Sequence, residues 1–181
     1  MRPDDVQRSQ FLSYVLRHKP EKIGLTLDAQ GWADLTTLLT QAQAHGAPLT
    51  LADVHRVVAG NDKKRFQLSE DGTRIRAVQG HSTAQVAIKR PAVRPPAVLY
   101  HGTADRFVAS ICKLGLLPGK RHQVHLSPDV PTAMAVGQRH GKVVIFQVDA
   151  AALHGRGHRF EQAENGVWLT DTVPAWALIR R

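Results

Sequence analysis

The feature that most constrains this chain is a proline-rich stretch near its middle. The segment HSTAQVAIKRPAVRPPAV, residues 81–98, contains three prolines. Proline lacks a backbone donor and restricts both its own conformation and that of the residue before it, so the segment favours an extended path. We therefore predict a linker over residues 83–96. It would join an N-terminal lobe, residues 1–82, to a C-terminal lobe, residues 97–181.

Length and composition agree with a chain of two small lobes. The 181 residues are 43% hydrophobic and 22% charged, which is typical of a globular protein and excludes a disordered one. No run reaches the roughly 18 apolar residues of a membrane helix. The N-terminus, MRPDDVQRSQ, has no apolar core of a signal peptide, so we expect a cytoplasmic protein. A single cysteine, Cys112, excludes an internal disulfide.

The charge indicates a polyanionic partner. The formal net charge is +9, with 13 Lys and Arg against 9 Asp and Glu in residues 1–90 and 11 against 6 in residues 91–181. The excess is therefore spread over both lobes. Nucleic acid is the commonest polyanion that such a surface would attract. A generally basic surface with no dedicated partner is the alternative.

The N-terminal lobe is expected to contain three helices followed by a hairpin. An apolar stripe through Val6 and Phe11 predicts a first helix that stops at Pro20. Asp34 can cap a second helix, and Thr50 with Asp53 resembles a capping box for a third. The segments RFQLS and TRIRAV flank Glu-Asp-Gly, which predicts a β-hairpin. This order matches a winged-helix module.

The C-terminal lobe is expected to be α+β, with a small, mostly antiparallel sheet. Ser127-Pro128-Asp129 predicts a helix start with Ser127 as the cap. Strands are predicted at 98–101, 122–126, 143–148, 159–162, 166–169 and 176–180, and helices near 105–115 and 129–139.

Two groups of residues in the N-terminal lobe could bind phosphate. Arg17 and His18 lie at the end of the first helix, where arginine can bind phosphate oxygens and histidine can move protons. A solvated helix end is the alternative. Arg65 opens the hairpin beside Lys63, Lys64, Arg74 and Arg76, and such a basic element can contact a nucleic-acid backbone or simply face water.

In the C-terminal lobe, polar residues cluster on two predicted strands. Tyr100-His101-Gly102-Thr103 ends one strand, where glycine could let a ligand approach the backbone. On the next, period-two alternation places Arg121, Gln123 and His125 on one face, as expected for a lined cleft.

A metal site is not expected. His122 and His125 would point to opposite faces of their strand, and His154 and His158 have no carboxylate or cysteine nearby in the sequence. Cys112 sits among apolar residues of a predicted helix, as a core residue would. Arginine and histidine dominate instead, which suits the stabilisation of phosphate charge without a metal.

The sequence resembles the RNA 2′-phosphotransferase family, whose eukaryotic members finish tRNA splicing. The resemblance covers nearly the whole chain. In the N-terminal lobe it runs through SQFLSYVLRHKPEKIGLTLDAQGWADLTTLL and NDKKRFQLSEDGTRIRAVQGHS. In the C-terminal lobe it includes LYHGT, RHQVHLSPD, VGQRHGKVVIFQVDA and NGVWLTDTVPAWAL. One departure is that members often have His directly before Val-His, where this chain has Gln123.

The resemblance implies a winged-helix lobe joined to an ADP-ribosyltransferase-like lobe, with the active site in the cleft between them. The family's Arg-His-Arg-Arg tetrad corresponds to Arg17, His18, Arg65 and Arg121, and Lys64 is expected to add a contact to RNA phosphate. The ADP-ribosyltransferase triad corresponds to His101, His125 and Val167, with Gly102, Thr103 and Ser127 completing an NAD⁺ site.

The implied activity is removal of an internal RNA 2′-phosphate with NAD⁺ as co-substrate, by a monomer and without a metal. The 2′-phosphate would first be ADP-ribosylated, releasing nicotinamide. ADP-ribose 1″,2″-cyclic phosphate would then leave. Three alternatives remain: a winged-helix DNA-binding regulator, a transferase that permanently ADP-ribosylates RNA or DNA ends, and a structural protein.

Overall fold

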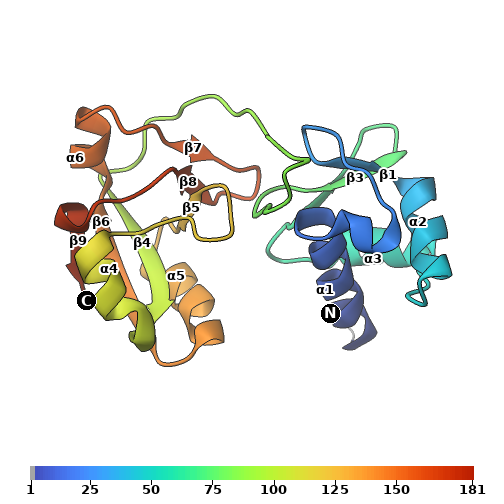
Figure 1. Cartoon of the computed structure of the whole chain (residues 1–181), viewed down its shortest axis with the longest axis horizontal. Coiled ribbons are helices and arrows are strands. Elements are labelled where there is room, and N and C mark those ends of the chain that lie inside the picture. Colours follow the sequence, from blue (N-terminus) through green and yellow to red (C-terminus); the bar gives the residue numbers. More distant parts are fainter. Residues whose placement is uncertain (1–2) are drawn as a thin grey trace. The chain divides into compact units, whose positions relative to one another are not determined.

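The computed structural model describes residues 3–181 and divides the chain into two compact units. The N-terminal unit ends at Lys89, and the C-terminal unit spans Arg90–Arg181. The fold is mixed α/β, and the strand pairs found within residues 3–181 are antiparallel (Figure 1). Over the same residues, no helix has both the length and the apolarity needed to cross a bilayer.

The N-terminal unit contains the three predicted helices and the predicted hairpin. Strands β2 and β3 form this hairpin, with Phe66 opposite Ala77, and the sheet order is β1-β3-β2. The short strand β1 was not predicted, because three residues are too few to show a period of two. The elements are α1 (Pro3–Arg17), a 3₁₀ turn η1 (Pro20–Ile23), β1 (Trp32–Asp34), α2 (Leu35–Ala44), α3 (Leu51–Ala59), β2 (Phe66–Leu68) and β3 (Arg74–Ala77).

The predicted caps of α2 and α3 are confirmed. The Asp34 carboxylate accepts a hydrogen bond from the backbone N–H of Thr37 at 2.7 Å. Thr50 and Asp53 form a reciprocal capping box at the start of α3. These bonds satisfy backbone donors that the first turn of a helix leaves without partners.

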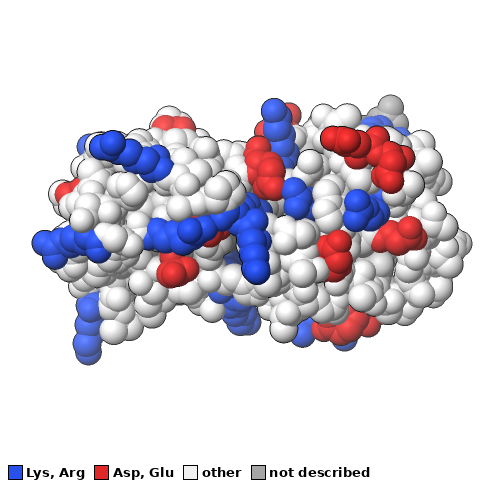
Figure 2. Space-filling view, turned by 90° about the horizontal axis from the view of Figure 1, so that it is seen from above, with Lys and Arg blue, Asp and Glu red and all other residues white. Residues whose placement is uncertain are grey.

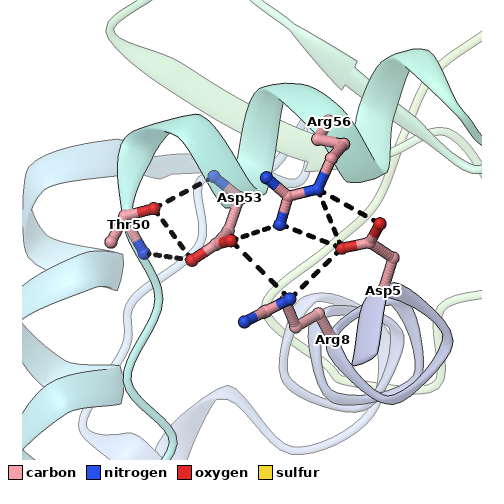
Figure 3. Close-up of polar contacts among 5 residues, drawn as sticks. All are labelled: Asp5, Arg8, Thr50, Asp53 and Arg56. Carbon is pink, nitrogen blue, oxygen red and sulfur yellow. Dashed lines mark hydrogen bonds and ion pairs between the residues drawn. The ribbon is translucent and has the colours of Figure 1, made fainter. Parts of the chain in front are cut away.

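A network of charged side chains joins α1 to α3 (Figure 3). Asp5 is buried and accepts bonds from Arg56 at 3.1 Å and from Arg8 at 3.2 Å. Arg56 also pairs with Asp53. The hydrogen bond from Arg56 lowers the pKa of Asp5 below its ordinary value. Val6, which we placed in the buried stripe of α1, is instead exposed, because Asp5 takes the position that faces α3.

The first part of the predicted linker, residues 83–96, is attached to the N-terminal unit. Val86 is buried in its hydrophobic core. The Gln85 side chain accepts a bond from the backbone N–H of Leu27 at 2.8 Å. The N–H of Ala87 donates to the carbonyl of Ala29 at 2.9 Å.

The later part of this segment is attached to the C-terminal unit. The N–H of Val93 donates to the carbonyl of Phe160 at 2.8 Å, and directly after the segment the N–H of Ala151 donates to the carbonyl of Ala97 at 3.0 Å. Prolines prevent a helix here, but their neighbours still form backbone bonds from an extended path. Most of the segment therefore belongs to one unit or the other.

The C-terminal unit contains two three-stranded sheets, ordered β4-β6-β9 and β5-β8-β7. Tyr100 and Ser127 link the sheets through backbone bonds of 2.9 and 2.7 Å. The elements are β4 (Val98–Ala104), η2 (Asp105–Phe107), α4 (Val108–Leu114), β5 (Val124–Leu126), α5 (Val130–Gly137), η3 (Gln138–His140), β6 (Val143–Asp149), α6 (Ala150–Gly155), β7 (Glu161–Gln162), β8 (Trp168–Thr170), η4 (Ala175–Ala177) and β9 (Leu178–Arg180).

Two details of this unit correct the sequence interpretation. The cap of α5 is Asp129, which accepts from the N–H of Thr132 at 2.7 Å, so the prediction of Ser127 was wrong. Ser127 is instead engaged in the bridge to Tyr100. Helix α6 was not predicted, although Asp149 caps it through the N–H of Ala152.

Helix α5 packs directly on β4, and two glycines permit this. A Cβ added to Gly102 would lie 1.7 Å from the carbonyl oxygen of Ala133 in α5. A Cβ added to Gly137 would lie 2.5 Å from a methyl carbon of Val143. The helix backbone therefore approaches the strand more closely than any side chain would permit. The absence of a side chain at Gly102 is explained by this close packing of α5.

Candidate functional site

In the N-terminal unit, residues 80–83 return to the end of α1, where Arg17 and His18 lie. The backbone N–H groups of Ser82 and Thr83 donate to the carbonyl of Arg17 at 2.9 and 3.3 Å. They satisfy a carbonyl that the last turn of a helix leaves without an intrahelical partner. The Arg17 side chain is buried, and a Cβ added to Gly80 would lie 3.7 Å from its guanidinium carbon. The returning chain therefore packs against this guanidinium.

His18 contacts the same returning segment through its imidazole. Its Nδ1 lies 2.9 Å from the hydroxyl oxygen of Ser82. A contact at Nδ1 orients the ring, so that proton transfer would involve the other ring nitrogen, Nε2. Ser82 is thus a contact of His18 that the sequence interpretation missed.

Arg65 is tied to the same part of the unit. Its Nη1 donates to the side-chain oxygen of Asn61 at 3.2 Å, and the N–H of Val78 donates to its carbonyl at 3.0 Å. Asn61 is buried and also contacts Ser9 of α1 at 3.4 Å. Burial lowers the pKa of Arg65, although a guanidinium stays charged at neutral pH. The structure therefore connects Arg17, His18 and Arg65 to one short segment, residues 78–83.

The backbone next to Arg65 is in an unusual conformation. Lys64 has a φ of 43°, in the left-handed region that residues other than glycine seldom adopt. Its N–H donates to the carbonyl of Asn61 at 2.8 Å, which closes a turn. Such conformations persist where the surrounding structure fixes them, and they are common at functional sites.

In the C-terminal unit, His101 and His125 lie together across neighbouring strands. Nδ1 of His101 lies 3.0 Å from the backbone carbonyl of His125. A carbonyl only accepts, so Nδ1 carries the proton and donates. Desolvation lowers the pKa of His101, and the charges of Arg121 and His140 lower it further. At neutral pH the ring is therefore neutral, with Nε2 as a hydrogen-bond acceptor.

Ser127 and Val167 lie beside this pair. Ser127 follows β5 and is bonded to Tyr100, the residue before His101. Val167 directly precedes Trp168, which pairs with Leu126 across β5 and β8. His101 and His125 thus lie in β4 and β5, while Ser127 directly follows β5 and Val167 directly precedes β8. Thr103 is buried in β4, opposite Val144 of β6, two positions beyond His101.

Arg121 lies in a turn rather than on a strand. Its N–H donates to the carbonyl of Pro118 at 3.2 Å, and β5 begins only at Val124. The period-two argument that put Arg121 on one strand face with His125 therefore does not apply. Its charge nevertheless acts on His101, since it contributes to the lowered pKa of that ring.

Two further observations bear on the chemistry of the site. No group of three or more His, Cys, Asp or Glu that could hold a metal ion was found within residues 3–181. On the face shown in Figure 2, Lys and Arg spread over the C-terminal unit, at the left as in Figure 1, with fewer Asp and Glu among them. Basic side chains on this face would attract a polyanion.

The chain is similar in sequence to proteins of one known family. The family described as "RNA 2′-phosphotransferase, Tpt1 / KptA family" matches residues 3–172. A protein of Agrobacterium fabrum is 61% identical over 166 residues, which is 92% of this chain and 89% of that protein. One of Pseudomonas fluorescens is 59% identical over 92% of this chain and 91% of its own length. One of Burkholderia lata is 58% identical over 96% and 89%. Each is named "Probable RNA 2′-phosphotransferase".

Proposed function

This chain belongs to the RNA 2′-phosphotransferase family of transferases, and we propose that it removes an internal 2′-phosphate from RNA with NAD⁺ as co-substrate. The observation that carries the proposal is that Arg17, His18 and Arg65 each contact residues 78–83, Arg65 through its backbone carbonyl. Two guanidiniums and an imidazole suit a phosphoryl group. The neutral His101 beside His125 supplies a second, different site.

Arg121 completes the phosphate site in this proposal. Lys64, in the turn before Arg65, contacts RNA phosphate, and the N-terminal unit acts as a winged-helix lobe. The C-terminal unit acts as an ADP-ribosyltransferase-like lobe. The enzyme works as a cytoplasmic monomer and needs no metal.

NAD⁺ is bound by the C-terminal unit in this proposal, along His101, Gly102, Thr103, His125, Ser127 and Val167. The chemistry of these residues fits a dinucleotide. Nε2 of the neutral His101 can accept a hydrogen bond from a ribose hydroxyl, and the Ser127 hydroxyl can donate to a phosphate. An apolar residue, Val167, lies where a carboxylate would repel the incoming RNA phosphate.

The first step joins the RNA to ADP-ribose. A 2′-phosphate oxygen forms a bond to C1″ of the nicotinamide ribose, and the bond between C1″ and nicotinamide breaks. The phosphate is already anionic, so no strong base is required. The chain's task is to hold the two reactants in line, which reduces the entropic part of the barrier.

The second step releases the RNA. The ribose O2″ attacks phosphorus, the bond to the RNA 2′-oxygen breaks, and ADP-ribose 1″,2″-cyclic phosphate leaves. Negative charge builds on the phosphate oxygens, and the three guanidiniums Arg17, Arg65 and Arg121 stabilise it. His18 transfers a proton, for example to the departing 2′-oxygen. Loss of one arginine should therefore slow this step more than the first.

The direct test is incubation of the purified chain with NAD⁺ and an oligonucleotide that carries one internal 2′-phosphate. Mass spectrometry should find RNA with a free 2′-hydroxyl, nicotinamide and ADP-ribose cyclic phosphate, and none of them when NAD⁺ is omitted. RNA that keeps ADP-ribose on a terminal phosphate would instead indicate a permanent ADP-ribosyltransferase. If none of these products forms, the chain would be a nucleic-acid-binding protein rather than an enzyme.

A further inference from the structure

The end of α6 and the loop that follows it carry cations and imidazoles, and the proposed reaction uses none of them. Their sequence is His-Gly-Arg-Gly-His-Arg, residues 154–159. A Cβ added to Gly155 or Gly157 would meet nothing within 4 Å, so the backbone on both sides of Arg156 is open to an approaching molecule. Gly157 has a φ of 87°, which a side chain would disfavour.

Arg156 stacks on an exposed aromatic ring. Its guanidinium carbon lies 4.4 Å from the ring centroid of Trp176, whose residue is 52% exposed. Within residues 3–181, no carboxylate forms an ion pair with Arg156. A guanidinium over an aromatic ring keeps its charge, and its outer side is available to a planar group. Unpaired RNA bases stack on arginine planes and on aromatic rings in this manner.

A cavity of about 260 Å³ adjoins the same loop. Its apolar walls are Ala92, Val93 and Phe160, and its polar groups include the imidazoles of His154 and His158. The backbone bond from Val93 to Phe160 holds one wall in place. A nucleobase combines apolar faces with hydrogen-bonding edges, so this lining matches it better than it matches a bare phosphate.

We propose that residues 154–159 and Trp176 form a second RNA-binding surface, which takes unpaired nucleotides of the substrate away from the reacting phosphate. The proposal rests on the proposed function in taking RNA as the ligand. Charge complementarity favours RNA, because residues 91–181 hold 11 Lys and Arg against 6 Asp and Glu. Stacking on Arg156 and Trp176 supplies an attraction that does not depend on base identity.

The test is a binding measurement on the full chain without NAD⁺. Fluorescence anisotropy would compare single-stranded RNA of about 20 nucleotides, without a 2′-phosphate, with a trinucleotide that carries one. For Arg156→Ala, we expect the Kd of the long RNA to rise about tenfold and the Kd of the trinucleotide to stay unchanged.

Arg106→Ala is the matched control, because Arg106 also stacks on an exposed aromatic ring of the same unit, 4.7 Å from the Phe107 centroid. It should bind the long RNA like wild type. Arg156→Lys keeps the charge without the planar face and should lose part of the affinity. The proposal is overturned if Arg156→Ala binds the long RNA normally, or if Arg106→Ala weakens it equally. Because no turnover is measured, these results are independent of the 2′-phosphotransferase activity.

Discussion

Replacing Gly102 by alanine should destabilise the C-terminal unit by about 3 kcal/mol. The new Cβ would lie 1.7 Å from the Ala133 carbonyl oxygen and 2.6 Å from its carbonyl carbon, whereas ordinary contacts lie near 3.5 Å. Helix α5 would have to move by roughly 2 Å. Overpacking costs about 1–3 kcal/mol, and the upper end applies because the obstacle is backbone rather than a flexible side chain. For a unit of this size, the melting temperature should fall by roughly 10–20 °C.

Thermal unfolding followed by tryptophan fluorescence measures this effect in one unit. In a Trp32→Phe background the remaining tryptophans, Trp168 and Trp176, both belong to the C-terminal unit. Gly155→Ala is the control, because its Cβ would meet nothing within 4 Å and alanine favours the helix that Gly155 ends. A Gly102→Ala protein that melts within roughly 2 °C of the background would refute the packing argument.

Three further predictions concern single contacts. Ser82→Ala should slow the release of ADP-ribose cyclic phosphate by about tenfold because His18 loses the hydroxyl 2.9 Å from Nδ1, and Ser82→Thr should restore the rate in a single-turnover assay. Arg56 lowers the pKa of Asp5 in the folded chain, so this carboxylate stabilises the fold above about pH 4 and the effect is lost in more acidic solution. The stability difference between wild type and Asp5→Asn in urea unfolding should therefore shrink below about pH 4, and a constant difference would contradict it. Desolvation lowers the pKa of His101, so the KM for NAD⁺ should be constant above about pH 6.5 and rise only in more acidic solution.

The local structure of this chain was largely predictable because it depends on neighbouring residues. Asp34 and Thr50 cap helices through bonds that reach only three positions along the chain. The same reasoning failed at Ser127, where two cap candidates lie close together and the sheet bridge to Tyr100 decided between them. The hydrogen bonds of the proline segment to both units could not be predicted from its composition.

The positions of the site residues depend on contacts that are distant in sequence. His18 and Ser82 are 64 positions apart, and only the folded chain shows that they meet. The sequence did not indicate that the missing side chain of Gly102 accommodates α5. The family resemblance named the arginines and histidines, but it did not indicate Ser82 or Asn61, which hold them.

A single-turnover time course of Arg121→Ala with NAD⁺ and 2′-phosphorylated RNA tests most directly whether Arg121 acts on the same phosphate as Arg17, His18 and Arg65. We expect ADP-ribosylated RNA to accumulate, with its breakdown slowed by about a hundredfold or more, while Lys120→Ala behaves like wild type. If Arg121→Ala forms and clears this intermediate as fast as wild type, the four residues do not share one phosphate, and the proposed site is wrong.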